Sequence, residues 1–430
     1  MKILIVSYEA WRDTNNGGNV LSNIFSAFDK DDIAQIYCSG ELPSNSICSK
    51  YFQLSSSMLL SSQKGKKLKE EIYQNSDSSQ ADLLENSVKR KMPSFFRETA
   101  LFMRELLWDI VNWKTPELTS FVEEFNPDII FAPCYSYSHV SKLALHVQKI
   151  LGCPMISYIS DDNYSLKCVS FSPLFWIGRL KTRKWIRRHF EKCQLIYTMT
   201  DLQKDEYEKI FGVPMKVLCK AASFDKEDKS TVNTPVKLIY GGGLYLNRWK
   251  VLSELSSVLR RINSEKVIAQ LHIYSNTKLK SRTAKLLNDG YNSFLHSAIP
   301  FSELEKEYQN SDIAIHVESF DLRNRLLTRL SFSTKIIDCM NSGCAVLAIG
   351  PQTQAGIKYL KDNNAALCIN EMECIDDEIA NLLSNTEKII FYSKQAKILG
   401  KRNHKKEKID SMVRTDFSSV IETFHSESLL

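Results

Sequence analysis

Paired cysteines are missing from this chain of 430 residues. Its 11 cysteines occur singly, with no C-x-x-C motif and no histidines at the spacing of metal ligands. Scattered cysteines of this kind are typical of reduced thiols and argue against a disulfide framework or a structural zinc site. We therefore expect no bound metal ion, and we also expect no cofactor.

Long apolar runs are also absent. No segment approaches the roughly 18 uninterrupted apolar residues that a membrane-spanning helix needs. The first residues, MKILIVSYEAW, reach Glu9 after a short apolar run and contain no small-residue cleavage site, so we expect no secretory signal there. These absences predict a cytoplasmic protein, which could still contact the inner face of the cell membrane.

The chain has no large excess of one charge. Its 56 Lys and Arg residues exceed its 50 Asp and Glu residues by a net charge of only +6. This balance does not indicate a nucleic-acid partner, but it is compatible with phosphorylated or membrane-surface partners. The loop after the first apolar run also lacks the G-x-G-x-x-G pattern, which disfavours a nicotinamide-dependent dehydrogenase.

What the sequence does contain is a regular alternation of apolar, β-branched runs with helical patterns. The runs in the first half are KILIVS (2–7), IAQIYC (33–38), PDIIFAP (127–133), PMISYIS (154–160) and LIYTM (195–199). The runs in the second half are KLIYGGG (237–243), AQLHIYS (269–275), NSFLHSAI (292–299), DIAIHVE (312–318) and CAVLAIG (344–350). Alternation of this kind is typical of parallel sheets covered by helices. We predict an α/β protein with two tandem doubly wound, Rossmann-like domains, since one core rarely serves so long a chain.

A polar, charged stretch at 224–235 separates the two halves and is predicted to be the interdomain linker. The expected domains are therefore an N-terminal one at 1–223 and a C-terminal one at 236–400, followed by a helical tail at 401–430. The tail is predicted to be helical because its apolar residues recur at helical spacing.

Two segments of the first domain have unusual composition. A segment at about 54–113 does not fit the alternation, and its second part, 94–113, is strongly apolar with one polar stripe. It is predicted to be an inserted helix that either packs on its own domain or lies at a membrane interface.

The segment 175–192 interleaves seven Lys and Arg residues with aromatic ones. It is either a solvated helix face or a contact for anionic headgroups.

The segment YGGGLYLNRWK, at 240–250, combines glycines with cations after a predicted strand. Gly242 and Gly243 would let the backbone approach a ligand closely. Arg248 and Lys250 open the next predicted helix, where cations oppose the helix dipole. An anion such as a phosphate, bound between them and the backbone amides, would remove that conflict.

A second segment, SFSTKIIDCMNSGCAVLAIGP at 331–351, begins another predicted helix. Ser333 or Thr334 could cap this helix, and Lys335 would add positive charge for a phosphate. Asp338 lies about one turn further along the same face, where its carboxylate could accept bonds from the two hydroxyls of a ribose. Gly343 is predicted to end the helix in a left-handed conformation.

These segments resemble a known family. The N-terminal strand with its Gly-Gly loop, the GGG…R-x-K segment and the S-T-K-x-x-D helix are similar to those of GT-B-fold glycosyltransferases that use nucleotide-sugar donors. The resemblance is to the large bacterial group that builds capsular, exopolysaccharide and lipopolysaccharide glycans. It implies two Rossmann-like domains facing a cleft, with an acceptor-side N-terminal domain, a donor-binding C-terminal domain and a tail helix that crosses back to the first domain.

The resemblance also implies roles for individual residues. Arg248 and Lys250 would contact the donor diphosphate, opposite Ser333, Thr334 and Lys335, and Asp338 would hold the ribose. The residues implied to lie near the base are Tyr274, Ser275, Ile299 and Pro300. Gly17 and Gly18 would bring the backbone of the N-terminal domain close to the transferred sugar or the phosphate.

Two positions depart from the family pattern and concern catalysis. Leu330 stands where many retaining relatives carry a glutamate, and Glu318 could substitute for it in space. Asp161 and Asp162 stand where relatives often have a histidine, and either could act as a general base or simply cap a turn. Retention or inversion of configuration therefore stays undetermined.

The expected function is transfer of a sugar from a nucleotide diphosphate-sugar to a glycan or polyprenyl-linked acceptor in surface polysaccharide synthesis, without a bound metal. One alternative is a sugar-nucleotide epimerase on the same fold. Another is a catalytically inactive protein that binds a sugar nucleotide and partners a second transferase.

Overall fold

The computed structural model describes residues 1–13, 16–61, 65–68, 94–227 and 229–428. The chain forms two compact units: unit 1 comprises Met1–Leu218 and Asp410–Leu430, and unit 2 comprises Cys219–Ile409. The boundary thus lies ahead of the stretch 224–235 that we predicted as the linker. Phe224 explains the difference, because its buried ring packs against Gly400 and fixes this part of the chain to unit 2.

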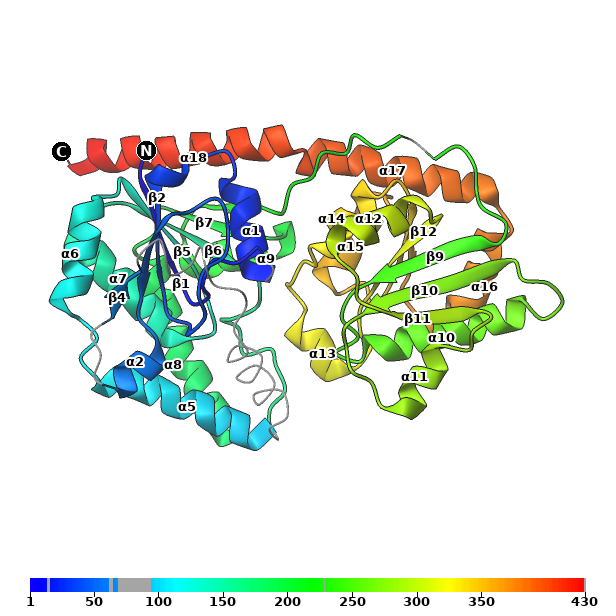
Figure 1. Cartoon of the computed structure of the whole chain (residues 1–430), viewed down its shortest axis with the longest axis horizontal. Helices are drawn as coiled ribbons and strands as arrows, with labels where there is room; N and C mark the ends of the chain where they lie inside the picture. The colour runs from blue at the N-terminus through cyan, green and yellow to red at the C-terminus, as the bar shows by residue number, and fades with distance from the viewer. Residues whose placement is uncertain (14–15, 62–64, 69–93, 228, 429–430) are drawn as a thin grey trace. The chain divides into compact units, whose positions relative to one another are not determined.

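Unit 1 is built on a sheet in the order β4-β3-β2-β1-β5-β6-β7-β8, parallel except for the antiparallel edge strand β4. The strands are β1 (Ile3–Ser7), β2 (Ile33–Tyr37), β3 (Lys50–Gln53), β4 (Lys66–Lys67), β5 (Ile129–Pro133), β6 (Met155–Ile159), β7 (Leu195–Thr198) and β8 (Met215–Val217). The five runs predicted as strands are β1, β2, β5, β6 and β7, and every residue in them is buried. Continuous burial explains why these strands are mostly apolar, since helices cover both faces of such a sheet (Figure 1).

The helices of unit 1 begin and end at residues suited to those positions. They are α1 (Asn16–Phe25), η1 (Lys30–Asp32), α2 (Ser56–Leu60), α5 (Ser94–Ile110), α6 (Pro116–Phe125), α7 (Ser138–Leu151), α8 (Pro173–Phe190), α9 (Asp201–Phe211) and, from Asp410 on, α18 (Lys406–Ser428). Thr115 and Ser172 cap α6 and α8, each followed by a proline at the first helical position. Helix α5 falls in the inserted segment, of which 62–64 and 69–93 lie outside the described residues.

The C-terminal tail packs on unit 1 from Asp410 onward. Phe417 of α18 is fully buried against Phe25 and Phe131, with ring centroids 5.9 and 6.0 Å away. Tyr197 Oη donates a hydrogen bond of 2.8 Å to the carboxylate of Asp416. The apolar spacing of the tail therefore corresponds to one helix face buried on this unit.

Unit 2 has a six-stranded parallel sheet in the order β11-β10-β9-β12-β13-β14. Its strands are β9 (Val236–Gly241), β10 (Ala269–Ser275), β11 (Ser293–Ser297), β12 (Ile313–Val317), β13 (Ala345–Ile349) and β14 (Leu367–Ile369). The strand order reverses between β9 and β12, as in doubly wound dinucleotide-binding sheets. The predicted α/β class with two doubly wound domains is confirmed.

The helices of unit 2 lie on both faces of its sheet (Figure 1). They are α10 (Arg248–Ile262), α11 (Ser281–Leu287), α12 (Phe301–Gln309), α13 (Leu322–Leu327), α14 (Lys335–Asn341), α15 (Ala355–Asp362), η2 (Met372–Cys374), α16 (Ile375–Leu383) and α17 (Thr386–His404). Across the described ranges of both units, no helix is long and apolar enough to cross a membrane.

Candidate functional site

Polar residues gather where the sheet of unit 2 reverses its strand order. Doubly wound sheets bind ligands beyond the carboxyl ends of their strands at such a point. Gly242 and Gly243 follow β9, and Glu318 follows β12. Arg248 and Lys335, the first residues of α10 and α14, complete the group.

Gly242 allows the side chain of Lys335 to lie directly against the loop after β9. A methyl group on Gly242 would overlap Nζ and Cε of Lys335. A methyl group on Gly243 would overlap the ring of Tyr245 in the same way. The loop thus needs glycine at both positions, because any side chain would displace a neighbouring one.

Arg248 and Glu318 form a buried ion pair. Arg248 Nη2 donates to Glu318 Oε1 at 2.9 Å and to Oε2 at 3.1 Å, and the two residues are only 8% and 7% exposed. Burial raises the pKa of Glu318, and the charge of Arg248 opposes this rise. Within the described part of the chain Arg248 Nε has no hydrogen-bond partner, so the guanidinium retains an unused donor.

Lys335 is a second cation beside this pair. Its Nζ lies 5.7 Å from the centre of the Tyr240 ring and has no ion-pair partner among the residues that the structure describes. Burial, and then the nearby charge of Arg248, lower the pKa of Lys335 to about 8. Glu318 and Asp338 are the carboxylates that act on Lys335, but Glu318 is paired with Arg248 and Asp338 with Lys220. The group therefore carries excess positive charge that an anionic ligand would neutralise.

His316 adds no charge to this group. It is buried on β12, and its Nε2 lies 3.5 Å from Glu318 Oε1. Burial, followed by the charges of Arg248 and Lys335, lowers the pKa of His316 to about 3. The imidazole is therefore neutral at physiological pH. Its place beside Glu318 could not be predicted from the sequence, because no motif marks a histidine inside a buried strand.

Lys250 does not share the position of Arg248. Its side chain is exposed and its Nζ lies 3.3 Å from both carboxylate oxygens of Asp321. Two positions along a helix correspond to about 200° of rotation, so Arg248 and Lys250 point to different sides of α10. The geometry therefore does not support the predicted pairing of these two cations around one phosphate.

Ser333 and Thr334 do not cap α14 with their side chains. Thr334 precedes the helix but has helical backbone angles, φ −57° and ψ −21°, and its hydroxyl makes no capping bond. A capping residue normally has extended angles that direct its side chain to the free N–H groups. The predicted cap is therefore wrong, although Lys335 does begin the helix.

Asp338 is held by Lys220, which no motif in the sequence indicates. Lys220 Nζ donates a hydrogen bond of 2.7 Å to Asp338 Oδ1, and both side chains are largely buried. A ribose bound at this carboxylate would have to replace or share the contact with Lys220. Gly343, with φ +84°, follows the end of α14 in the left-handed conformation that we predicted.

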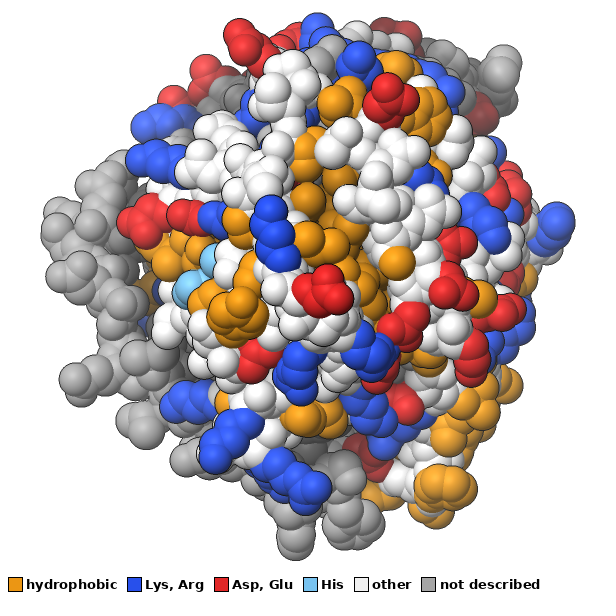
Figure 2. Space-filling model, turned by 90° about the vertical axis from the view of Figure 1, so that its right-hand side faces the viewer, with side chains coloured by type: hydrophobic (Ala, Val, Ile, Leu, Met, Phe, Trp, Pro, Cys, Tyr) orange, Lys and Arg blue, Asp and Glu red, His pale blue; other side chains and the backbone are white. Residues whose placement is uncertain are grey.

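The residues predicted near the base lie at the carboxyl ends of β10 and β11. Tyr274 stacks on His296 with ring centroids 4.6 Å apart, and His296 is hydrogen-bonded to His272 at 3.1 Å. Ser275 is buried, and Ile299 lies just before α12. Figure 2 shows histidine side chains beside hydrophobic ones on the surface of unit 2, together with interspersed cations and anions.

In unit 1 the two candidate catalytic aspartates, which follow β6, differ in their surroundings. Asp162 accepts hydrogen bonds from Ser165 N and Tyr207 Oη, both at 2.8 Å, and lies 3.8 Å from Arg179. This carboxylate therefore holds the turn, which is the structural alternative we considered. Asp161 is exposed at the carboxyl edge of the sheet, and its predicted role as a general base stays a prediction.

Gly17 and Gly18 lie in the first turn of α1. A methyl group on Gly18 would overlap the backbone of Arg12, so this glycine permits close packing of the helix on the preceding loop. Packing within unit 1 therefore explains why this position needs a glycine. The contact of Gly17 and Gly18 with a sugar or phosphate stays a prediction.

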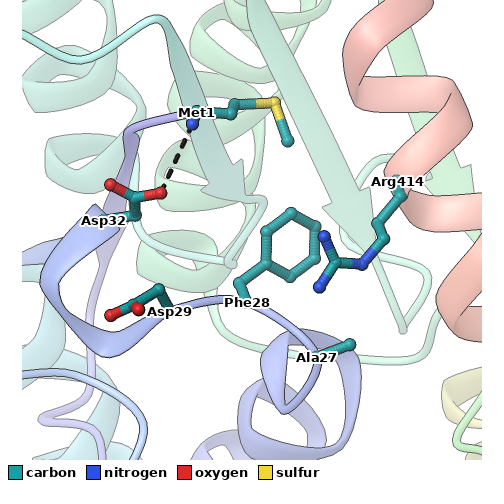
Figure 3. A pocket seen from close by; sticks show the side chains of 6 residues that line it. All are labelled: Met1, Ala27, Phe28, Asp29, Asp32 and Arg414. Carbon is teal, nitrogen blue, oxygen red and sulfur yellow. Dashed lines mark hydrogen bonds and ion pairs between the residues drawn. The ribbon is translucent and has the colours of Figure 1, made fainter.

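A surface pocket of about 450 Å³ lies elsewhere in unit 1 (Figure 3). It is lined by Met1, Ala27, Phe28, Asp29, Asp32 and Arg414. Met1 and Asp32 precede β1 and β2, so the pocket lies at the amino ends of these strands, opposite to the edge where doubly wound sheets bind ligands. Within the described ranges, no group of three or more His, Cys, Asp or Glu residues could hold a metal ion.

Comparison with known proteins identifies the fold. No family model matches the sequence, and no curated protein matches it significantly. Among solved structures, Anabaena Alr3699/HepE in complex with UDP matches with a TM-score of 0.63 and 10% identity over 97% of this chain and 100% of that one. The α,α-trehalose 6-phosphate synthase of Burkholderia multivorans matches with a TM-score of 0.61 and 10% identity over 99% and 98%. TarM matches with a TM-score of 0.53 and 14% identity over 73% and 58%.

These neighbours are GT-B glycosyltransferases. The chain therefore has the GT-B fold that its motifs indicated. At such low identity the similarity establishes the fold alone, so the function must be argued from the side chains described above.

Proposed function

We propose that the protein transfers a sugar from a nucleotide diphosphate-sugar to a hydroxyl of a glycan or polyprenyl-linked acceptor in surface polysaccharide synthesis. The observation that carries this proposal is Lys335, a largely buried ammonium ion without an ion-pair partner in the described part of the chain, beside Arg248 at the switch point of unit 2. An anion is the ligand that relieves this arrangement. The GT-B neighbour HepE is recorded with UDP and with UDP-glucose, which supports a nucleotide-sugar as that anion.

In this proposal the two cations act on the leaving group. Lys335 and Arg248 bind the diphosphate and neutralise the charge that develops as the bond between the sugar and the phosphate breaks. Asp338 accepts bonds from the ribose, and Tyr274 with Ser275 lies on the side of the base. The acceptor oxygen forms the new bond to the sugar, and Asp161 is the candidate to take its proton.

Glu318 has a supporting part in this scheme. Both of its oxygens bind Arg248, so the carboxylate is not free to attack a sugar in the way a nucleophile would. It orients Arg248 for the diphosphate and keeps part of its charge balanced before the donor arrives. All 11 cysteines are free thiols, which favours a reducing, cytoplasmic location for the reaction.

A thermal-shift experiment tests the donor part of the proposal. The full-length protein is heated with UDP, ADP or GDP in the absence of divalent metal, because a ligand that binds only the folded state raises the melting temperature. At about 100 times its dissociation constant the matching nucleotide should stabilise unit 2 by about 2.7 kcal/mol, which raises the melting temperature of a unit of this size by roughly 5–10 °C. Failure of all three nucleotides to shift the transition would contradict the proposal.

An inactive sugar-nucleotide-binding protein is the second candidate. Leu330 is fully buried where many retaining transferases carry a glutamate, so no carboxylate is available at that position. Incubation with UDP-glucose and analysis of the products separates the candidates. Binding without consumption of the donor, with acceptor glycans present, would favour the inactive protein, whereas an epimerised sugar formed without acceptor would indicate an epimerase.

A further inference from the structure

Helix α5 of unit 1 turns its charged residues toward the protein. Arg104 Nη1 donates to Tyr8 Oη at 2.9 Å. Glu105 accepts a hydrogen bond from Ser138 Oγ at 2.6 Å and lies 2.7 Å from His139 Nδ1. Burial alone would raise the pKa of Glu105, but these contacts outweigh that effect and lower it to about 2. Trp108, one turn further along, is buried. Arg104 and Glu105 therefore pack on unit 1.

The opposite side of α5 is apolar and exposed. Met103 is 58% exposed and Ile110 is 82% exposed. These residues are seven positions apart, which places them two turns apart on one stripe, on the side away from Trp108. A soluble helix usually buries its apolar residues, so the exposure of Met103 and Ile110 on α5 is unusual.

Helix α8 exposes a stripe of mixed character beside α5. Ile177, Leu180, Lys184 and Arg188 are exposed and recur at helical spacing, so they share one face. Thr182, Ile186, His189 and Phe190 are buried on the other face. The exposed stripe is apolar toward the start of α8 and cationic toward its end.

The cations at the end of this stripe are not neutralised by the part of the chain that the structure describes. Pro173–Phe190 contains six Lys or Arg residues and no Asp or Glu. Lys181 is paired with Asp109 of α5, which joins the two helices. By contrast, Lys184 and Arg188 have no ion-pair partner among the described residues.

Exposed hydrophobic residues of unit 1 are concentrated in this region. Nine of the large exposed ones that the structure describes belong to unit 1, and seven of these lie on α5, on α8 or in the loop before α8. Phe171, at the end of that loop, is 98% exposed. Figure 1 shows α5 and α8 next to each other at one end of unit 1. We call Met103, Ile110, Ile177, Leu180, Lys184 and Arg188 the α5–α8 surface.

We propose that the α5–α8 surface binds an anionic lipid bilayer. Clustered, exposed apolar side chains mark an interaction surface, since single ones are normally scattered. Unneutralised Lys and Arg beside them match the negative charge of lipid headgroups, while the apolar residues enter the boundary with the acyl chains. The inference goes beyond sugar transfer and does not depend on it, because lipid binding is measured without a nucleotide.

Vesicle co-sedimentation tests this inference with the full-length protein. The protein is mixed with vesicles of phosphatidylcholine alone, or of phosphatidylcholine with phosphatidylglycerol, and should sediment with the second kind. The variant Lys184→Gln/Arg188→Gln should lower the partition coefficient roughly thirty-fold, because each cation at an anionic surface contributes about five-fold. Ile110→Ser with Met103→Ser should reduce binding further without reducing the melting temperature, since both side chains are exposed.

Matched controls come from unit 2. Phe391 and Ile398 are exposed and seven positions apart on α17, and Lys278 and Lys280 are exposed cations. Phe391→Ser/Ile398→Ser and Lys278→Gln/Lys280→Gln should bind vesicles like the unchanged protein. Absence of sedimentation with anionic vesicles, or equal losses in the control variants, would overturn the proposal. Elution as a dimer that Ile110→Ser dissociates would assign the surface to a second copy of the chain and would also overturn it.

Discussion

Replacing Lys335 by methionine should change stability and nucleotide binding in opposite directions. Methionine keeps the approximate shape of the buried side chain and removes its charge. Burial and Arg248 lower the pKa of Lys335 from its ordinary 10.5 to about 8. This corresponds to at most about 3 kcal/mol against the charged form in the folded protein at neutral pH. We therefore expect Lys335→Met to raise the free energy of unfolding of the nucleotide-free protein by about 1–3 kcal/mol.

The same variant should bind more weakly the nucleoside diphosphate that stabilises the unchanged protein. The experiments below use UDP, the nucleotide recorded with HepE. A hydrogen bond from an ammonium ion to a phosphate oxygen contributes about 1.5–3 kcal/mol, so its loss should raise the dissociation constant roughly 10- to 150-fold. Urea unfolding with and without UDP measures both effects in one experiment. Lys250→Met is the control, because its exposed ion pair with Asp321 should change neither quantity by more than about 0.5 kcal/mol.

A lower free energy of unfolding together with unchanged UDP affinity would refute this reasoning. It would show that Lys335 stabilises the fold through contacts within the protein. If Lys335 had only such a structural role, removing its charge would not both stabilise the free protein and weaken nucleotide binding.

The remaining predictions concern pH, the loop after β9 and the carboxylates. The affinity for UDP should fall as pH rises above about 8, because Lys335 then loses its proton. The free energy of unfolding without nucleotide should rise between about pH 8 and pH 10.5, because over this range the lysine is protonated in the unfolded chain but not in the folded protein. Gly242→Ala should fold but should lose most of the UDP-induced rise in melting temperature, because the added methyl group would displace Lys335. Asp338→Asn should weaken UDP binding more than 2′-deoxy-UDP binding, as isothermal calorimetry can measure. Asp162→Asn should lower the free energy of unfolding by about 1–3 kcal/mol, since its carboxylate holds a turn, whereas Asp161→Asn should leave stability unchanged and reduce turnover.

Much of the fold could be predicted because buried parallel strands leave a plain signal. The runs at 2–7, 33–38, 237–243 and 344–350 are mostly apolar, and each contains a strand that is almost entirely buried. Short edge strands such as Lys66–Lys67 have no such signal, because one side of an edge strand faces solvent.

The candidate site could be predicted only in part. The positions of Arg248 and Lys335 follow from strand–loop–helix order, because the carboxyl ends of neighbouring strands meet at the switch point. The partners of Arg248 and Asp338 could not be predicted, since Glu318 and Lys220 lie far away in sequence and come together through tertiary packing. The misplacement of Lys250 was avoidable, because helical periodicity alone separates it from Arg248.

The most direct test of the account is the pKa of the Lys335 amine, measured by NMR of its ¹³Cε in the full-length protein and assigned with Lys335→Met. Without nucleotide the pKa should be about 8. With saturating UDP it should rise toward or above its ordinary value, since a bound diphosphate favours the protonated amine. A pKa that stays the same when UDP binds would show that Lys335 does not contact the diphosphate and would contradict the proposed site.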